Sequence, residues 1–522
     1  MVEIHFAFTM LLSLISNAIG ADILAIISTA SFSHQVSFRP LWKQLAANGH
    51  NVTLVTTDPL KEGDLKNIQQ IDISYSYEYM NKHEVVDIAI NESKSLYDSA
   101  LAIRKVYKDT HTKLFESPEG VNLAHNKENH FDLLIIEAQI PDMMIYSWLF
   151  DIPFVGICSL DCALQFHDTA GNQVHPVVNP DPNFETKDRY LLSFRERIFS
   201  SVYMGIYRFL VKFVMFPKQH VIWRKYFGEN VPLVDEIQSR MSMLFVGTNP
   251  VFHLVRALMP NTVTIGSGMH MTAPKPLTKD VKDFLDDASE GAIYFSLGSN
   301  IKGKHLNSSM KNTIINAFSK MPYKVLWKID DTFEKLPPNI LTSKWFSSQL
   351  EILRHSNVKL FITQGGLQSM QESIYANKPM IGIPYFGDQF GNVNRMVALE
   401  YGLKILKQNI TEESIREAVT EIMTNPVYTA NAQKYGEIFR DVDMSDTDKA
   451  VWWIEYVIRH KGARHFRNPL LDMPAWKRYM LDVLGVILFG FLVIIKVISF
   501  AFRTIKYLFK AGKPYGIEKK VA

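Results

Sequence analysis

The sequence predicts an α/β protein with two Rossmann-like domains that face a cleft, followed by one C-terminal transmembrane helix. Short continuous apolar runs recur in both halves of the chain, and helical patterns separate them. Runs of this kind are typical of parallel strands that are buried on both faces. A third observation is an almost wholly apolar stretch near the C-terminus, which is long enough to cross a bilayer.

Each half of the chain contributes four apolar runs. They lie at residues 23–27, 52–56, 133–136 and 154–157, and then at residues 292–297, 324–327, 359–362 and 380–383. Residues 269–278 contain Ala-Pro-Lys-Pro-Leu, which breaks the periodicity and predicts the linker. We therefore expect one domain at residues 21–270 and a second at residues 271–475.

The two ends of the chain carry targeting signals. Residues 1–20 are expected to be a signal peptide, because an apolar stretch ends in Ala18-Ile19-Gly20. Residues 479–502 are the expected span, and the basic tail at residues 503–522 is expected in the cytosol. Lys519 and Lys520 resemble a signal for retrieval to the endoplasmic reticulum, so we expect a single-pass type I protein of that membrane with a luminal body.

Composition narrows the function further. The 522 residues are 47% hydrophobic, which is enough for two full-sized cores, and the net charge of +3 gives no basic footprint for nucleic acid. Cys158 and Cys162 are the two cysteines, and we expect free, packed thiols. Four Asn-x-Ser/Thr sites occur, at Asn51, Asn91, Asn307 and Asn409, and Asn51 falls inside a predicted strand.

The strongest chemical signal follows the third apolar run of the second half. A strand ends at Gly365-Gly366 and a helix begins, so the backbone can approach phosphates and the free N–H groups of the helix face them. Gln368 and Glu372 share one face of that helix, where a carboxylate can accept two hydrogen bonds from a ribose diol. Asp388-Gln389 follow the next strand and suit sugar hydroxyls. On these residues alone, a plain turn is an open alternative.

Residues 361–369 in this context resemble the donor signature of UDP-glycosyltransferases, in the form found in membrane-bound insect members. Residues 294–299, 451–456 and 459–463 agree with the same family. The resemblance covers essentially the whole chain, and it implies the GT-B arrangement of two Rossmann-like domains.

The resemblance also implies roles for matching positions. Trp345 would stack on uracil, Glu372 would bind the ribose, Asp388 and Gln389 would bind the transferred sugar, and the diphosphate would meet Ser299, Gln364, Gly366, Gln368, Ser369 and Arg256, the last from across the cleft. Gln349 belongs to the same donor-binding set. Many relatives have His in place of Gln364. One extra residue separates Trp345 from Gln349, so Phe346 is an alternative uracil platform.

The candidate base lies in the first half. His34 follows the first strand, at the edge of a parallel sheet where ligands bind. An acceptor hydroxyl must lose its proton as it attacks the sugar, and imidazole suits that task near neutral pH. The resemblance makes His34 the base and places Glu137 where the family usually has Asp, as the carboxylate that orients the ring. A lone His is more often structural, and that reading stays open here.

No metal or other cofactor is expected, because the sequence shows no convincing metal-ligand spacing. Asp441-x-Asp443 and Asp446-x-Asp448 precede a helix, where capping and solvation explain them. The resemblance implies an inverting hexosyltransferase that moves a hexose, in the insect branch glucose, from a UDP-sugar to a small lipophilic acceptor, as in detoxification. One alternative is a non-catalytic family member that carries lipophilic compounds, and another is a structural or adhesion membrane protein. The sequence leaves a homo-oligomer open.

Overall fold

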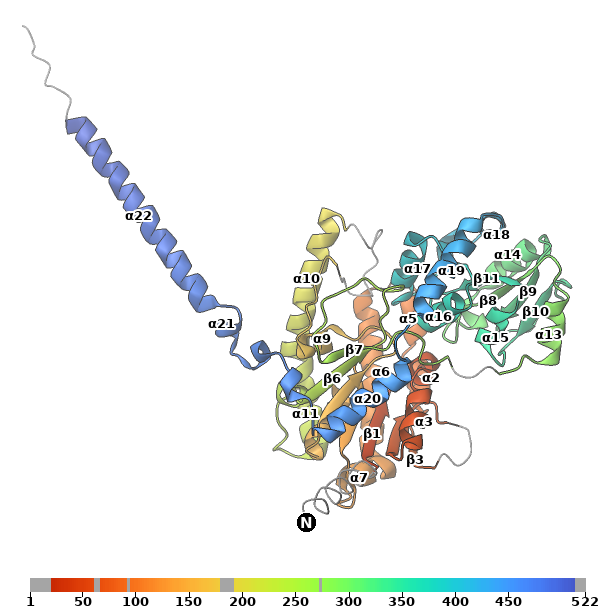
Figure 1. The fold of residues 1–522 in the computed structure, drawn as a ribbon, viewed down its shortest axis with the longest axis horizontal. Helices are drawn as coiled ribbons and strands as arrows, with labels where there is room; N and C mark the ends of the chain where they lie inside the picture. The colour runs from red at the N-terminus through yellow and green to blue at the C-terminus, as the bar shows by residue number, and fades with distance from the viewer. Residues whose placement is uncertain (1–19, 61–65, 92–93, 179–191, 272–274, 512–522) are drawn as a thin grey trace, which may run out of the picture. The chain divides into compact units, whose positions relative to one another are not determined.

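The structure of the chain is a computed structural model that describes residues 20–60, 66–91, 94–178, 192–271 and 275–511. Its contacts divide the chain into two compact units, Met1–Phe466 and Arg467–Ala522. The first unit holds two sheets, each with its own helices, which we call the first and second lobes (Figure 1). The signal peptide expected at residues 1–20 lies outside the described residues, apart from Gly20.

The first lobe is built on a seven-stranded parallel sheet with the order β3-β2-β1-β4-β5-β6-β7. Its strands are β1 (Asp22–Ile27), β2 (Asn51–Thr56), β3 (Ile68–Asp72), β4 (Leu133–Glu137), β5 (Phe154–Ile157), β6 (Met241–Val246) and β7 (Thr262–Thr264). Ile23 of β1 pairs with Val52 on one side and with Leu133 on the other. The four apolar runs predicted in this half are all strands of this sheet.

Helices cover both faces of the first sheet. The helices between these strands are α2 (Phe32–Val36), α3 (Arg39–Ala47), α4 (Ser76–Lys82), α5 (Val85–Ile90), α6 (Leu96–Glu116), α7 (Pro118–His125), α8 (Ile145–Leu149), α9 (Leu164–Ala170), α10 (Phe194–Leu210), α11 (Phe216–Phe227) and α12 (Val234–Gln238). Of these, α5 packs against the core of the second lobe through Val86 and Ile90. Successive residues of a strand point to opposite faces. Ile23 and Ala25 accordingly lie in one apolar core, while Leu24 and Ile26 lie in the other.

The second lobe has a six-stranded parallel sheet with the order β10-β9-β8-β11-β12-β13. Its strands are β8 (Ala292–Ser296), β9 (Lys324–Lys328), β10 (Ile340–Ser343), β11 (Val358–Thr363), β12 (Met380–Gly382) and β13 (Gly402–Lys404). Its helices are α13 (Lys279–Asp286), α14 (Ser308–Ser319), α15 (Gln349–Arg354), α16 (Leu367–Tyr375), α17 (Gln389–Ala398), α18 (Glu412–Thr424) and α19 (Pro426–Arg440). Two parallel sheets covered by helices confirm the predicted α/β class with two Rossmann-like domains.

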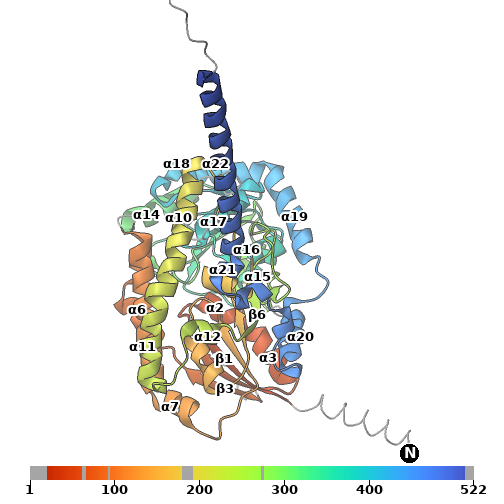
Figure 2. The same cartoon turned by 90° about the vertical axis from the view of Figure 1, so that its left-hand side faces the viewer.

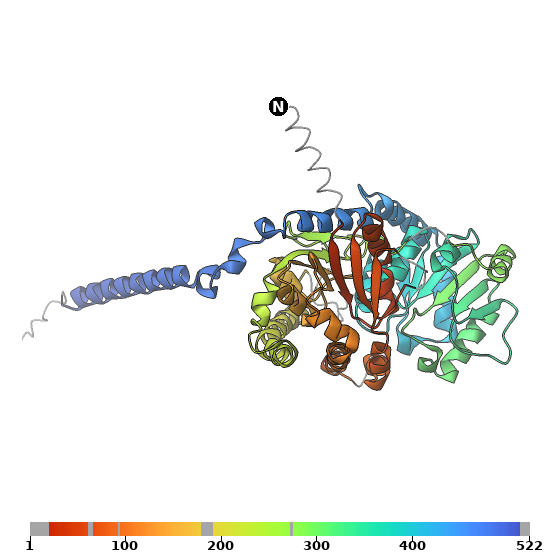
Figure 3. The ribbon, with the colours of Figure 1, turned by 90° about the horizontal axis from the view of Figure 1, so that it is seen from below.

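The last helix of the body, α20 (Asp446–Arg459), does not stay with the second lobe. Ala450, Val451, Ile454 and Val457 are buried in the core of the first lobe. Figure 2 shows α20 beside α3, and Figure 3 shows the same blue helix along the first sheet. The apolar face of α20, which lies within the residues 271–475 expected to form the second domain, thus packs on the first sheet. The expected domain bounds stay a prediction.

The second unit contains the short helix α21 (Ala475–Arg478) and the long helix α22 (Leu481–Ala511). The most apolar 18-residue window of α22 has a mean hydropathy of 2.7, and none of it is buried. This helix fits a single membrane span, and it runs beyond the expected end at residue 502. The final part of the expected tail, residues 512–522, lies outside the described residues.

Candidate active site

A cavity of about 420 Å³ opens between the two lobes of the first unit. The first lobe contributes Phe32, Ser33, Val36 and Arg39 to its lining, and the interlobe segment contributes His270, Met271 and Lys275. The second lobe contributes residues that follow or end strands β8, β9 and β11, among them Ser299, Lys328 and Gln364. The cavity therefore lies at the carboxyl ends of parallel strands, where ligands bind in open α/β sheets.

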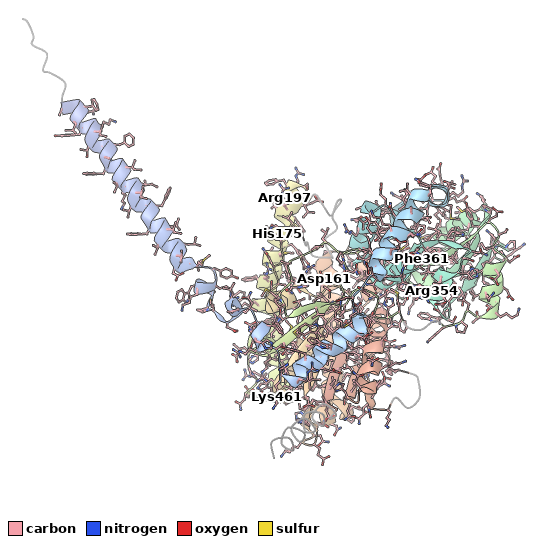
Figure 4. The ribbon with its side chains drawn as sticks, in the orientation of Figure 1. Asp161, His175, Arg197, Arg354, Phe361 and Lys461 are labelled. Carbon is pink, nitrogen blue, oxygen red and sulfur yellow. The ribbon has the colours of Figure 1, made fainter. Side chains whose placement is uncertain are left out.

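Nine residues predicted from the sequence to face the donor line this cavity. They are Ser299, Trp345, Phe346, Gln349, Gln364, Gly366, Gln368, Ser369 and Glu372. These side chains of the second lobe therefore lie together, with Phe346 included as the alternative to Trp345. Their roles toward a donor stay predictions. Figure 4 shows the side chains of the body, with Asp161 labelled in the first lobe and Phe361 of β11 in the second.

The candidate base is paired with its predicted carboxylate. His34 lies in α2, beyond the carboxyl end of β1, and Glu137 is the last residue of β4. Because β1 and β4 are neighbours in the sheet, the two side chains meet at the same edge. His34 Nδ1 lies 2.5 Å from Glu137 Oε1. This contact leaves Nε2 of His34 as the nitrogen that can take a proton from a ligand.

Glu137 is held at its other oxygen as well. Oε2 accepts a hydrogen bond of 3.2 Å from the backbone N–H of Thr29 and a second one from the Thr29 hydroxyl. The Thr29 hydroxyl also bonds the Tyr107 hydroxyl at 2.7 Å. The extra methylene of Glu137, compared with Asp, is thus accommodated by a fixed set of partners.

The pair changes the acid–base behaviour of His34. Burial favours the neutral ring and lowers the pKa, whereas attraction to Glu137 and the hydrogen bond with it raise the pKa, and Asp388 of the second lobe raises it further. The net pKa of His34 lies above its ordinary value of 6.5. Asp388 immediately precedes α17 of the second lobe, so a carboxylate of that lobe contributes to the raised pKa of His34.

On the donor side, three side chains form a connected cluster. Gln349 Nε2 donates to Glu372 Oε2 over 2.7 Å and to Ser369 Oγ over 2.9 Å. Ser369 and Glu372 are three residues apart on α16, so they share one face of the helix. The second oxygen of Glu372, Oε1, lies 3.4 Å from His270 Nε2, and both residues line the cavity.

The glycines after β8 and β11 serve close packing. Gly298 has φ +75°, and a Cβ at this position would overlap the amide nitrogen of Gln364. Gly365 has φ +87°, and its Cβ would overlap Val393. Gly298 therefore lets the loop after β8 approach Gln364, and Gly365 lets the loop after β11 approach Val393 of α17.

The two alternatives for the uracil platform have different environments. Trp345 is 54% exposed, whereas Phe346 is 8% exposed and packs in the core of the second lobe against Tyr294. The Trp345 ring meets Phe32 of the first lobe edge-on, with 5.4 Å between ring centroids. Both residues line the cavity, but Trp345 offers much more exposed ring surface for stacking than Phe346. The choice of uracil platform stays a prediction.

A family model described as "UDP-glucoronosyl and UDP-glucosyl transferase" matches residues 22–520. The chain belongs to this family. UDP-glycosyltransferase UGT5 of Dactylopius coccus is 30% identical over 511 residues, which cover 97% of this chain and 96% of that protein. UDP-glucuronosyltransferase 2B7 of Homo sapiens is 27% identical over 475 residues, which cover 88% of each protein. The chain is thus a transferase that uses a UDP-sugar donor.

Solved glycosyltransferases share its fold. The calicheamicin glycosyltransferase CalG4 has a TM-score of 0.54 at 17% identity and covers 84% of this chain and 98% of its own. Os79 of O. sativa, solved in complex with UDP, has a TM-score of 0.54 at 15% identity and covers 84% of this chain and all of its own. The two lobes of the transferase therefore form a GT-B fold.

Basic side chains that sequence reasoning missed also line the cavity of the transferase. Lys328 ends β9, and its Nζ lies 4.0 Å from the centre of the Trp345 ring. Burial lowers the pKa of Lys328 to about 8, although Glu372 acts in the opposite direction. Arg39 and Lys275 line the same cavity. A charged residue at the end of a buried strand was the available signal for Lys328.

Three predicted residues have other partners in the structure. Arg256 pairs with Asp161 and lies 3.1 Å from His167 Nε2, and it is not among the residues that line the cavity. Gln389 Oε1 accepts from the backbone N–H groups of Tyr385 at 2.8 Å and Phe386 at 3.1 Å. Asp388 accepts from Asn392 over 2.7 Å. Their contacts with the donor stay predictions.

A second histidine–carboxylate pair lies deeper in the first lobe. His111 Nδ1 is 2.9 Å from Asp142 Oδ2, and His111 Nε2 is 3.1 Å from the Ser28 hydroxyl. Burial raises the pKa of Asp142, but Arg104 and His111 lower it more, so the carboxylate stays charged. Both ring nitrogens of His111 and both carboxylate oxygens of Asp142 contact protein groups, so this pair stabilises the first lobe. Sequence reasoning missed it because Ser28, His111 and Asp142 lie on separate elements.

Three further predictions concern the two cysteines, a metal site and Asp446. Cys158 and Cys162 are both buried and free, and burial raises the pKa of Cys158. Within the described residues no group of three or more His, Cys, Asp or Glu side chains is arranged to hold a metal ion. Asp446, expected to be solvated, is instead buried and accepts a hydrogen bond of 2.5 Å from the Ser267 backbone N–H. That expectation was wrong because α20 packs against the interlobe segment.

Proposed function

We propose that the transferase moves glucose from UDP-glucose to a hydroxyl group of a small lipophilic acceptor, with inversion at the anomeric carbon. The observation that carries this proposal is the contact of His34 with Glu137 at the end of β4. His34 lies in α2, and its neighbours Phe32, Ser33 and Val36 in that helix line the cavity between the lobes. An imidazole oriented by a carboxylate is the arrangement that general-base catalysis of hydroxyl attack requires.

In the proposed reaction, His34 takes the acceptor proton through Nε2, because Nδ1 faces Glu137. The acceptor oxygen bonds the anomeric carbon while the bond from that carbon to the diphosphate oxygen breaks, and both electrons of the broken bond leave with UDP. Glu137 stabilises the imidazolium that forms. The first N–H groups of α16 and the Lys328 ammonium would stabilise the charge on the departing diphosphate.

Relatives support the choice of donor and acceptor class. UDP-glucosyltransferase 2 of Dactylopius coccus is 29% identical and covers 95% of this chain. An ecdysteroid UDP-glucosyltransferase of the Mamestra brassicae nuclear polyhedrosis virus is 30% identical and covers 84% of it. The name of the second protein states a steroid acceptor, and by analogy we assign a hydroxylated lipophilic acceptor to this transferase.

The test measures UDP release by microsomes that express the chain. UDP-glucose and UDP-glucuronate are each offered with a panel of phenols and steroid alcohols, and His34→Ala is compared with His355→Ala. His355 also contacts a carboxylate, Asp286, but it is not among the residues that line the cavity. We expect acceptor-dependent release from UDP-glucose that is lost in His34→Ala only. Faster release from UDP-glucuronate, or full activity of His34→Ala, would contradict the donor or the base, respectively.

We also propose that α22 crosses the endoplasmic reticulum membrane once, with the body in the lumen. This orientation is supported by the predicted signal peptide and by the apolar α22. It is also supported by three exposed asparagines in N-glycosylation sequences, Asn91, Asn307 and Asn409. The measurement is endoglycosidase H digestion together with protease treatment of sealed microsomes. A shift in size with endoglycosidase H and protection of the body are expected. A body that protease degrades without detergent would contradict the orientation.

A further inference from the structure

We propose that His270 is a donor-binding residue that hydrogen-bonds a ribose hydroxyl of the UDP-sugar together with Glu372. The inference rests on the proposed function, because it assigns a further contact within the same donor cavity. His270 lies in the segment that joins the two lobes, between β7 and α13. It comes from neither sheet, so no strand-and-loop pattern in the sequence marks it.

The first argument is an unpartnered ring nitrogen. The His270 side chain is 5% exposed, and its Nε2 atom has no hydrogen-bond partner among the described residues. The nearest carboxylate oxygen is Glu372 Oε1, at 3.4 Å. Buried polar atoms in proteins are almost always hydrogen-bonded, and those left without a partner call for an explanation. His270 lines the donor cavity, so a ligand there can supply the missing partner.

The second argument is that the two carboxylate oxygens of Glu372 have different partners. Its Oε2 already accepts a hydrogen bond of 2.7 Å from Gln349 Nε2, so Oε1 is the oxygen left for a ligand. A hydroxyl group donates one hydrogen bond and accepts others. A ribose hydroxyl that bridges Glu372 Oε1 and His270 Nε2 would donate to the carboxylate and accept from the ring N–H. Because these two atoms are 3.4 Å apart, the hydroxyl oxygen would lie to one side of the pair, about 2.8 Å from each atom.

The third argument is that His270 is held in place by its neighbours in the chain. Gln371 of the donor helix α16 donates through Nε2 to the Gly266 carbonyl over 2.9 Å. Asp446 of α20 accepts from the Ser267 N–H over 2.5 Å. The interlobe segment is therefore fixed from both lobes just before His270. The ring does not have to be ordered when the donor binds, which favours binding.

A ribose contact and a purely structural role make different predictions. Loss of a ribose contact weakens binding of UDP but matters less for an analogue that lacks the contacted hydroxyl. Loss of a structural side chain weakens the binding of UDP and its deoxy analogues by the same factor. The comparison of variant and analogue therefore measures the contact itself, as in a double-mutant cycle.

The experiment uses the full chain in detergent and measures the affinities of UDP, 2′-deoxy-UDP and 3′-deoxy-UDP by calorimetry. The variants are His270→Phe, which keeps a ring without a donor, and His270→Gln, which keeps an amide N–H. His355→Ala is the matched control. For His270→Phe we expect a loss of UDP affinity of about tenfold, the size of one hydrogen bond, and a reduced preference for UDP over one deoxy analogue. His270→Gln is expected to keep more of that preference.

Two outcomes would overturn the proposal in distinguishable ways. If the wild-type chain binds UDP and His270→Phe weakens all three ligands equally, His270 has a structural role and the ribose contact is wrong. If the wild-type chain binds none of the three ligands, the proposed function itself fails, and the ribose contact fails with it. The thermal midpoint of each variant, measured without ligand, separates a folding defect from a binding defect.

Discussion

Glu137 Oε1 lies 2.5 Å from His34 Nδ1, while Oε2 of the same carboxylate accepts from Thr29. The side chain thus needs its full length to reach both partners. We predict that Glu137→Gln lowers kcat by about 10²- to 10⁴-fold, the usual contribution of acid–base catalysis, because a neutral amide does not stabilise the imidazolium. The measurement is the rate of acceptor-dependent UDP release at saturating UDP-glucose.

Glu137→Asp is the informative companion. The Asp side chain is one methylene shorter. It keeps the negative charge but can contact only one of His34 and Thr29, so we expect a rate between those of Glu137→Gln and the wild type. A variant with Asp at 137 that is as active as the wild type would show that Thr29 contributes nothing to orientation. Thr29→Val removes the hydroxyl that donates to Glu137 Oε2 but keeps the backbone N–H, so we expect a rate between those of Glu137→Asp and the wild type.

The raised pKa of His34 predicts a pH dependence with a definite sign. The base acts as neutral imidazole, so activity requires loss of its proton. Because the pKa of His34 lies above 6.5, kcat/KM should rise with pH through a value above that figure. Glu137→Gln removes the main cause of the rise, and the acid limb of the profile should then move to lower pH. An acid limb unchanged by Glu137→Gln would assign the titration to another group.

Much of this site was predictable, because its parts are local in the sequence. His34 follows β1 and Gly365-Gly366 follow β11, so a strand pattern with a polar or glycine-rich end indicates each of them. The pairing of His34 with Glu137 also follows, once β1 and β4 are placed side by side in a parallel sheet.

Other features depend on contacts between distant segments, which periodicity does not report. The amphipathic pattern of α20 indicates a helix but not the lobe whose core it completes. Burial of Asp446 arises only because α20 meets Ser267. Arg256 was expected at the diphosphate, and its contact with Asp161, a carboxylate 95 positions away, is not visible in any motif.

Trp345 and Phe346 are the two candidates for stacking on uracil, and they differ in solvent exposure. Trp345 is half-exposed in the cavity and Phe346 is buried beneath it. We expect Trp345→Ala to lower UDP affinity by about 1–3 kcal/mol, as for lost base stacking, with little change in the thermal midpoint. Phe346→Ala should instead lower the thermal midpoint, because it leaves a void in the core. Calorimetry with UDP and thermal unfolding, run on both variants, would reveal a reversed pattern.

Gly298 provides a test of close packing in the donor site. A Cβ there would overlap the amide nitrogen at the end of the Gln364 side chain, and φ is +75°, so Gly298→Ala should push this amide aside and strain the loop after β8. Because Gln364 lines the cavity, we expect UDP binding to weaken about tenfold, the free energy of one hydrogen bond. Gly228→Ala is the matched control, since Gly228 has φ +95° with no atom within 4 Å of its Cβ. It should show a similar backbone strain and normal UDP affinity. Equal UDP affinities in the two variants would mean that strain, rather than the overlap, sets the effect.

The raised pKa of Asp446 predicts how the stability of the protein depends on pH. Burial raises its pKa from 3.8 to about 6, against the lowering effect of the Ser267 N–H. Between these values the folded chain keeps a proton that the unfolded chain has lost, so this group makes the protein less stable as pH rises from about 4 to about 6. Asp446→Asn keeps an acceptor for Ser267 without the charge. Its thermal midpoint should therefore exceed that of the wild type by about 2–4 °C at pH 7 and match it at pH 4. Asp448→Asn, in the same turn but exposed, should follow the wild-type curve, and a gain shared by both variants would trace the effect to the helix terminus instead.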